Sequence, residues 1–275
     1  MYKIVKKEIL NPTVVKISVE APRVAKKALP GQFIILRIDE KGERVPFTVA
    51  DFDRENGLVT VIFQIVGETT RRLAELSEGD FIQDFAGPLG KPTEIDENVK
   101  KVAVIGGGLG CAIALPQAKA LHDKGVEVDL IAGFKNRDLV ILEEEMKEAS
   151  SRLIITTDDG SAGRQGLVTQ VLSDEVAAGA KYDLVIAIGP VIMMKFVEKL
   201  TRELDLPLIV SLNPIMIDGT GMCGGCRVRI GGEIKFACVD GPDFDGHLVD
   251  FDELMARNRT YSEQEKHACK IGRGN

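Results

Sequence analysis

Short segments in which apolar and polar residues alternate occupy the first third of the chain. Six of them are rich in Val, Ile and Phe, and a period of two with this composition is typical of β-strands. They span residues 3–10, 14–20, 32–39, 46–52, 58–66 and 80–85. Turn-forming pairs separate them, and one short helix is predicted at 70–76. Six short strands favour a small antiparallel β-barrel, because closure of the sheet removes its exposed edges.

A different rhythm begins near residue 100. Continuous apolar runs alternate there with stretches of helix-forming residues, and the runs span 101–108, 126–134, 152–159, 183–189 and 206–212. Strands that are buried on both faces have this composition, so we predict an α/β domain with a parallel sheet covered by helices. The predicted division of the chain is a barrel at 1–98, an α/β domain at 99–212 and a small glycine-rich segment at 213–275.

Composition excludes several classes of protein. Apolar residues make up 44% of the 275 residues, which is enough to build hydrophobic cores. No apolar run approaches the roughly 18 residues that cross a bilayer, and the N-terminus has no signal-peptide pattern. The net charge of −7 argues against nucleic-acid binding. We therefore expect a cytoplasmic protein with neither a membrane nor a nucleic acid as its partner.

A strand that runs into glycines and then into a helix, KVAVIGGGLGCA, opens the α/β domain. Gly106, Gly108 and Gly110 would let backbone amides approach a pyrophosphate at the helix N-terminus. The alternative is a structural turn in which glycine only permits a positive φ. Cys111, which follows the turn, is expected to be a small buried thiol that packs the start of the helix.

Three further residues support dinucleotide binding. Asp158, Gly160 and Gly189 all follow predicted strands, at the carboxyl edge where open α/β sheets bind their ligands. The choice between NAD and NADP stays open. No acidic residue ends the second strand, and Lys135 and Arg137 could meet a 2′-phosphate or be solvated loop charges.

Three clustered cysteines carry the strongest chemical signal. Their spacing is Cys223-x2-Cys226-x11-Cys238, within a glycine-rich stretch. Plant-type [2Fe–2S] centres use C-x4-C-x2-C and a distant fourth cysteine. The first position of that pattern falls here on Asp218. Asp218 is therefore a candidate fourth ligand of a [2Fe–2S] cluster. Alternatively, Cys269 completes a four-sulfur site, which would suit structural zinc.

With a barrel, a dinucleotide-binding sheet and a C-terminal cluster in this order, the chain resembles the iron–sulfur branch of the ferredoxin–NADP reductase superfamily. That branch includes the electron-transfer subunits of dihydroorotate dehydrogenase and of NADH-dependent reduced ferredoxin:NADP oxidoreductase. The resemblance covers essentially all of the chain and is most specific at DGTGMCGGC and FACVDGPDFDGHLVDF. The aspartate at position 218 is similar to the second of these subunits.

The resemblance implies that the barrel binds FAD. In the family, an Arg-x-Tyr-Ser-like element contacts the pyrophosphate through its arginine and the isoalloxazine ring through its last two residues. The corresponding stretch here, with one residue inserted, contains Arg44, Pro46, Phe47 and Thr48. A Gly-x-x-Thr-like turn that opens a helix corresponds to Gly67, Thr69 and Thr70. A threonine at a helix start also suits a phosphate on physical grounds.

The activity that the resemblance implies is that of an NAD(P)H-dependent oxidoreductase subunit. Electrons would move between NAD(H) or NADP(H), FAD and the [2Fe–2S] cluster, and on to a large flavoprotein and iron–sulfur subunit in a heterodimer. Ferredoxin would be reached through that partner, in an enzyme that supports electron bifurcation. Hydride transfer to a flavin requires no side-chain acid or base, so no catalytic residue is assigned. The alternatives are the dihydroorotate dehydrogenase subunit and a flavin-reductase-like binding module that contains structural zinc.

Overall fold

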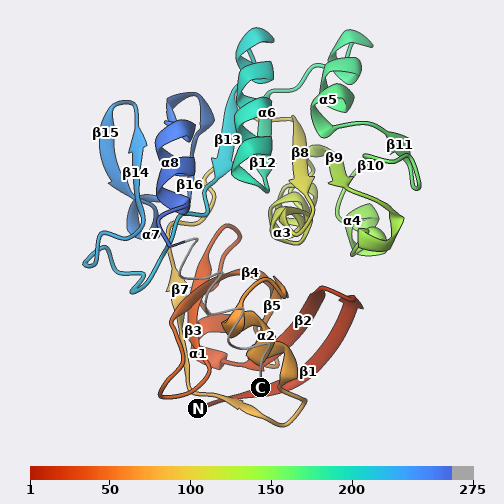
Figure 1. The fold of residues 1–275 in the computed structure, drawn as a ribbon. Coiled ribbons are helices and arrows are strands. Elements are labelled where there is room, and N and C mark those ends of the chain that lie inside the picture. Colours follow the sequence, from red (N-terminus) through yellow and green to blue (C-terminus); the bar gives the residue numbers. More distant parts are fainter. Residues whose placement is uncertain (262–275) are drawn as a thin grey trace.

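The protein, seen here in a computed structural model that describes residues 1–261, has an antiparallel barrel and a mostly parallel sheet flanked by helices. A smaller C-terminal segment lies beside that sheet, and the barrel forms the other end of the molecule (Figure 1). Both parts of the predicted fold class are therefore confirmed. Among the described residues, no helix is both long enough and apolar enough to cross a bilayer.

Seven strands form the barrel, in the order β6-β1-β2-β5-β4-β3-β7. They are β1 (Tyr2–Asn11), β2 (Val14–Glu20), β3 (Phe33–Arg37), β4 (Val45–Asp53), β5 (Leu58–Gln64), β6 (Phe81–Ile82) and β7 (Asp84–Leu89), accompanied by helices α1 (Pro22–Ala25) and α2 (Glu68–Glu75). The last predicted strand is in fact two, because β6 pairs with β1 and β7 pairs with β3. Only Gln83 separates β6 from β7, so the two ends of the sheet meet and the barrel nearly closes.

The second sheet has the order β11-β10-β9-β8-β12-β13-β16. Its strands are β8 (Lys101–Gly107), β9 (Glu127–Phe134), β10 (Arg152–Thr157), β11 (Arg164–Gln165), β12 (Leu184–Ile188), β13 (Leu208–Ser211) and β16 (Asp243–Asp245). The five strands predicted in this half are all present and parallel. Sequence reasoning missed β11 and the antiparallel β16, because two or three residues are too few to show a period.

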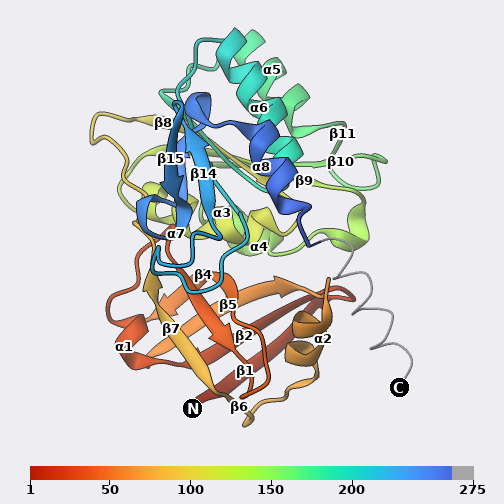
Figure 2. The same ribbon diagram turned by 60° about the vertical axis from the view of Figure 1, so that its left-hand side comes forward.

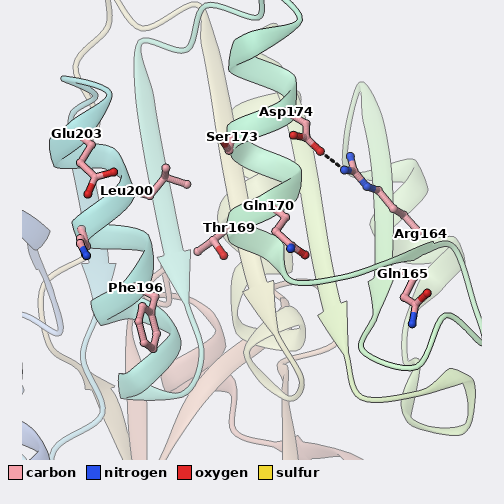
Figure 3. Close-up of a pocket in the computed structure, with 10 residues that line it drawn as sticks. Arg164, Gln165, Thr169, Gln170, Ser173, Asp174, Phe196, Leu200 and Glu203 are labelled. Carbon is pink, nitrogen blue, oxygen red and sulfur yellow. Dashed lines mark hydrogen bonds and ion pairs between the residues drawn. The ribbon is translucent and has the colours of Figure 1, made fainter.

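Helices cover both faces of the second sheet. They are α3 (Gly110–His122), η1 (Arg137–Leu139), α4 (Glu143–Glu148), α5 (Val168–Ala177) and α6 (Val191–Glu203). Helices α3 and α4 lie on the side that faces the barrel, and α5 and α6 lie on the other side (Figures 1 and 2). A groove of about 520 Å³ runs between α5 and α6, where Phe196 lies near Thr169 (Figure 3). The groove contains none of the residues predicted to bind a cofactor.

The C-terminal segment is built onto the second sheet. It contains β14 (Arg227–Ile230), β15 (Glu233–Phe236), α7 (Ala237–Asp240), η2 (Gly246–Leu248) and α8 (Phe251–Asn258), in addition to β16. Cys226, Val228 and Cys238 belong to the same hydrophobic core as the residues under α5 and α6. The segment thus shares a core with the sheet, as expected for a stretch with few apolar residues of its own. The domain boundaries after residues 98 and 212 stay a prediction.

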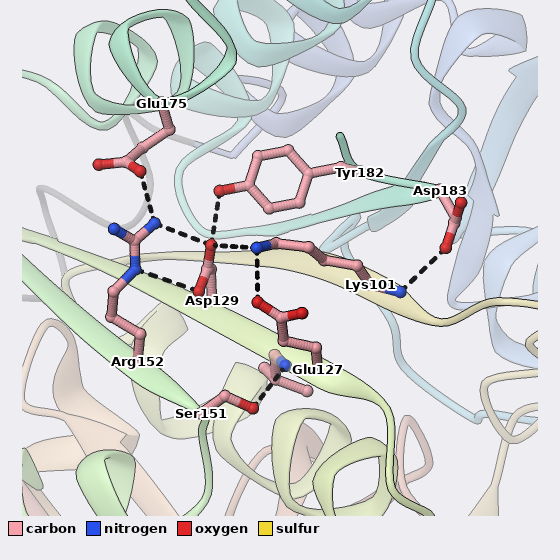
Figure 4. Close-up of polar contacts among 9 residues, drawn as sticks. Lys101, Glu127, Asp129, Ser151, Arg152, Glu175, Tyr182 and Asp183 are labelled. Carbon is pink, nitrogen blue, oxygen red and sulfur yellow. Dashed lines mark hydrogen bonds and ion pairs between the residues drawn. The ribbon is translucent and has the colours of Figure 1, made fainter. Parts of the chain in front are cut away.

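A charged cluster ties together the amino ends of β8, β9 and β10 (Figure 4). The buried Asp129 carboxylate accepts hydrogen bonds from Arg152, at 3.2 and 2.8 Å, and from the Tyr182 hydroxyl, at 2.7 Å. The Lys101 ammonium lies 3.6 Å from it. Burial acts to raise the pKa of the Asp129 carboxyl, but these donors outweigh it and hold the pKa below its usual range. The ionised carboxylate therefore stabilises the folded state.

Asp129→Ala should lower the free energy of unfolding by about 3 kcal/mol, because a buried ion-pair partner is lost. Glu127→Ala, which removes a half-exposed partner of Lys101, should cost less than about 1 kcal/mol. Because the pKa of Asp129 is lowered in the folded state, its carboxylate stabilises the fold fully above the unfolded-state pKa of about 3.9. That stabilisation is lost as the pH falls through the folded-state pKa. Denaturant unfolding between pH 7 and pH 3 measures both effects, and equal losses in the two variants would contradict the argument.

Candidate functional site

Strand β4 carries most of the stretch predicted to bind a flavin. Arg44 is exposed and immediately precedes the strand, and Pro46, Phe47 and Thr48 are half-buried within it. The ring of Phe47 packs against that of Phe63 inside the barrel, with 5.6 Å between the ring centroids. Because successive strand residues point to opposite faces, Pro46 and Thr48 point away from the barrel interior. Phe47 therefore lies on the opposite face of the strand from the other two.

The outward face of β4 continues across β3. Thr48 is paired with Phe33 and Pro46 with Ile35 in the antiparallel register, and directly opposed residues share a face. Phe33 and Ile35 pack in the core that also holds the second sheet and Cys226. The outward face of the barrel therefore meets the parallel sheet and the cysteine segment. Any ring bound at Thr48 would lie at that junction.

The start of helix α2 is arranged as an anion site. The Thr70 hydroxyl accepts hydrogen bonds from the backbone N–H groups of Val66 and Gly67, both at 3.0 Å, and builds the turn. The Thr69 hydroxyl donates to the Glu43 carboxylate at 2.9 Å. A negative group thus already lies where the helix dipole and the first amides of the helix favour one. The Gly67 N–H is already bonded to Thr70, so the donors that fit a pyrophosphate here are the backbone N–H groups of Thr69 and Thr70 in the first turn of the helix.

The glycines in the turn after β8 allow close packing of helix α3 on the sheet, and they also leave room for a ligand beside the backbone. A Cβ at Gly106 would lie 2.7 Å from the Cα of Cys111, and one at Gly110 would lie 2.2 Å from the carbonyl oxygen of Ile188. These two glycines let α3 pack closely on β8 and β12. Gly108 is half-buried, with a φ of +56° and nothing within 4 Å of where a Cβ would lie, so a ligand could come close to the backbone there. Cys111 is fully buried as expected, and burial raises the pKa of its thiol to about 12.

The remaining residues predicted to bind a dinucleotide lie along the same edge. The N–H of Asp158 donates to the carbonyl of Phe134 at 3.1 Å, which joins the ends of β10 and β9, and Gly160 follows in the same loop. Gly189 follows β12 directly. The Oδ1 atom of Asn136, just past β9, is buried without a partner among the described residues. An unpaired oxygen at this edge suits a ribose hydroxyl, and nothing in the sequence singled out Asn136.

Two of the three clustered cysteines meet in the C-terminal segment. The Sγ atoms of Cys226 and Cys238 lie 3.2 Å apart, and both residues are buried. Burial and the neighbouring thiol raise the pKa of Cys238 to about 12, although the Gly221 amide beside its sulfur acts in the opposite direction. Cys223 is exposed. Paired sulfurs with nearby amides fit a cluster held by thiolates.

Asp218 lies in the same loop as the exposed cysteine. Its carboxylate accepts hydrogen bonds from the backbone N–H groups of Thr220 and Cys223, both at 2.8 Å. These bonds lower the pKa of the Asp218 carboxyl. In residues 1–261, no group of three or more His, Cys, Asp or Glu side chains converges as a ready metal site. Cys269, the alternative fourth ligand, lies outside the described residues.

The cysteine loop packs directly on the barrel. Gly219, next to Asp218, has a φ of +74°, and a Cβ there would lie 2.7 Å from Cδ1 of Leu89 and 3.1 Å from Cγ1 of Ile35. Leu89 ends β7, and Ile35 is the register partner of Pro46. The structure thus brings the segment predicted to hold a cluster against the face predicted to hold a flavin. No local sequence signal marks this contact, because the two sides are far apart along the chain.

The C-terminal segment matches a known protein family. Residues 213–250 match the family described as the iron–sulfur cluster binding domain of dihydroorotate dehydrogenase B. A homologue of the dihydroorotate dehydrogenase B (NAD(+)) electron transfer subunit from Thermotoga maritima is 49% identical, over 96% of this chain and 93% of that protein. The electron transfer subunit itself from Caldanaerobacter subterraneus is 34% identical, over 80% of this chain and 86% of that one.

Solved structures agree with the sequence relatives. A chain from the structure of an NADH-dependent reduced ferredoxin–NADP oxidoreductase, which was described for its flavin-based electron bifurcation, is 48% identical with a TM-score of 0.93. The match covers 98% of this chain and 97% of that chain. The ferredoxin reductase of carbazole 1,9a-dioxygenase, at 20% identity and a TM-score of 0.65 over 75% of this chain and 65% of that one, shares the fold.

These likenesses confirm the resemblance stated from the sequence. Relatives and fold neighbours are oxidoreductase subunits and reductases, in agreement with the predicted enzyme class. The family supports the cofactors predicted above, which are an iron–sulfur cluster, a flavin and a nicotinamide dinucleotide. The chain belongs to the family of dihydroorotate dehydrogenase electron-transfer subunits and their homologues.

Proposed function

We propose that this protein is the electron-transfer subunit of an oxidoreductase that moves electrons between a nicotinamide dinucleotide, FAD in the barrel and a [2Fe–2S] cluster in the C-terminal segment. A large flavoprotein and iron–sulfur subunit receives or supplies the electrons on the far side of the cluster. The favoured enzyme is an electron-bifurcating NADH-dependent ferredoxin:NADP oxidoreductase. The likeness to a chain of such an enzyme, at 48% identity over nearly the whole length, supports this choice.

One contact carries the proposal. Gly219 of the cysteine loop packs against Ile35, and Ile35 lies opposite Pro46 on the side of the barrel that we propose faces the flavin. Because the two elements are in contact, a flavin bound to one and a cluster bound to the other would be neighbours. Electrons pass efficiently only between groups that are held this close together.

The residues of this chain bind and orient rather than react. Thr69, Thr70 and the first amides of α2 would hold the FAD pyrophosphate, and Thr48 would present a neutral hydroxyl at the ring. The backbone at Gly108 and the loop at Asp158 would hold the dinucleotide at the carboxyl edge of the sheet. FAD, when bound, supplies the conversion between two-electron and one-electron chemistry.

The proposed cluster ligands are Asp218, Cys223, Cys226 and Cys238. A carboxylate is a harder ligand than a thiolate, so Asp218 separates this chain from a dihydroorotate dehydrogenase subunit with cysteine at that position. The amides of Thr220 and Cys223 hold the carboxylate ionised and in the loop, which is the state a metal ligand requires. Structural zinc completed by Cys269 is the competing assignment, and it would leave the flavin without a cluster in this chain to accept its electrons.

Gly219→Val should slow electron passage from flavin to cluster by roughly tenfold to a hundredfold, because the added side chain displaces the loop from Ile35 and Leu89. Anaerobic rapid mixing with NADH separates this step from flavin reduction by wavelength. Flavin reduction itself should keep its wild-type rate, since the residues proposed to hold the dinucleotide follow β8, β10 and β12 and do not belong to the cysteine loop.

Gly232→Val is the matched control for that experiment. Gly232 also has a positive φ, +85°, but a Cβ there meets nothing within 4 Å. Both variants therefore carry the same backbone strain, and only one of them meets the barrel. Equal slowing in the two variants, or slowing of flavin reduction alone, would contradict the proposed path.

Asp218→Cys should shift the midpoint potential of the cluster from that of the wild-type protein, because the softness and covalency of one iron–ligand bond change. The cluster content should stay near two irons per chain, as a [2Fe–2S] centre requires. A redox titration followed by visible absorption measures the shift. Identical midpoints with full iron content would mean that Asp218 is not a ligand.

A further inference from the structure

Asp243 lies where the three parts of the chain meet. It begins β16, which pairs with β13 at Ser211 (Figure 1). Its Oδ2 atom accepts a hydrogen bond from the hydroxyl of Thr93, in the connection that follows the barrel, at 2.5 Å. The same oxygen accepts one from Nε2 of Gln117 on helix α3, at 3.2 Å. A Cβ at Gly31 of the barrel would lie 3.1 Å from it. One carboxyl group thus touches the barrel, the sheet and the cysteine segment.

Two oxygen atoms at this junction lack partners in the part of the chain that the structure describes. Asp243 keeps part of its surface exposed, but its Oδ1 atom is shielded from solvent and makes no hydrogen bond to any residue in 1–261. The Oε1 atom of Gln117, whose amide nitrogen already bonds to Asp243, is likewise buried and unpaired. Both atoms are acceptors, so they cannot bond to each other unless one of them carries a proton. A buried unpaired acceptor costs free energy, and an ionised one costs more.

A single proton removes both deficits. A proton on Oδ1 of Asp243 turns that oxygen into a donor, and Oε1 of the adjacent amide is an acceptor without a donor. Together with the existing bond from Nε2, this gives two hydrogen bonds between one carboxylic acid and one carboxamide. We propose that Asp243 is a neutral carboxylic acid at pH 7, paired with Gln117, and that this pair positions the cysteine segment against the barrel and the dinucleotide sheet.

Among the described residues, no cation contacts the carboxyl to stabilise its ionised form. The groups that contact the carboxyl are Thr93 from the connection, Gln117 from α3 and Ser211 from β13, and all three are uncharged. Burial raises the pKa of Asp243, and the hydrogen bonds from these neighbours offset this only in part. In an ion pair such as that of Asp129, by contrast, cations hold the charge in place.

Backbone contacts of the two residues before Asp243 explain what the pair positions. The N–H of Leu212 donates to the carbonyl of Pro242 at 2.9 Å, and the N–H of Lys91 donates to the carbonyl of Gly241 at 2.7 Å. The first bond joins the segment to β13, and the second joins it to the connection after the barrel. Gly241 and Pro242 come directly after α7, which carries Cys238. The inference concerns how these parts are held together and does not depend on the proposed function.

Asp243→Asn tests the protonation state. An amide reproduces the neutral acid, because its nitrogen can donate to Oε1 of Gln117, but it cannot carry a charge. If Asp243 is neutral when folded, its raised pKa destabilises the wild type increasingly as pH rises above the unfolded value of about 3.9. The unfolding equilibrium constant of the wild type should therefore rise about tenfold per pH unit relative to Asp243→Asn between about pH 4 and 7.

Asp245→Asn, in the same strand but exposed, is the control and should show no such pH-dependent difference. Infrared difference spectra of wild type minus Asp243→Asn at pH 7 give a second readout, which should contain the carbonyl band of a protonated carboxylic acid. A carboxylate band in its place, or a stability difference that does not change with pH, would overturn the assignment.

Hydrogen exchange at the junction tests the positioning role. Asp243→Ala should speed exchange at the amides of Leu212 and Lys91 by about tenfold or more, because losing a buried hydrogen-bonded partner costs at least about 1.4 kcal/mol locally. Asp243→Asn should keep the wild-type rates at both amides. Unchanged exchange in Asp243→Ala would show that the pair does not hold the segment, and equal acceleration in both variants would overturn the acid–amide pair.

Discussion

The two-residue period of strand β3 is the constraint on which the rest of the structure depends. Ile34 and Leu36 point into the barrel, whereas Phe33 and Ile35 pack in the core shared by the second sheet and the cysteine segment. Because successive side chains of a strand point to opposite faces, one short strand contributes to two cores. A slip of one residue would exchange the two faces. The register of β3 with β4 therefore fixes both the face at Thr48 and the contact with Gly219.

Glycine at the cysteine loop follows from the same constraint. The outward face of β3 is apolar and flat enough to accept a backbone, and Gly219 supplies one at a positive φ without a Cβ. The loop can then bring Asp218 and Cys223 close to the barrel while Cys226 and Cys238 stay buried in the core below. The chemistry proposed for the protein therefore depends on packing between elements far apart in the sequence, more than on any reactive side chain.

Periodicity was sufficient to predict the barrel, the parallel sheet and their order, because both extend over many residues. The short strands β11 and β16 were missed, since their pairing is determined by neighbours that lie elsewhere in the chain. The glycine turn and the cysteine cluster could be picked out as candidate sites, because each depends on local spacing in the sequence. Asn136, Gly219 and Asp243 could not, because each matters through a tertiary contact or an unpaired atom that only the fold creates.

The central claim is that one chain holds both a flavin and a [2Fe–2S] cluster. Its most direct test is the visible spectrum of the purified protein, with flavin, iron and acid-labile sulfide counted per chain. A chain that holds both should show flavin bands with a broad shoulder toward the red, and about two irons and two sulfides. Iron should be lost in Cys226→Ala but kept in Cys111→Ala, in which an equally buried thiol outside the cluster is removed. Flavin with one zinc and no sulfide would contradict it.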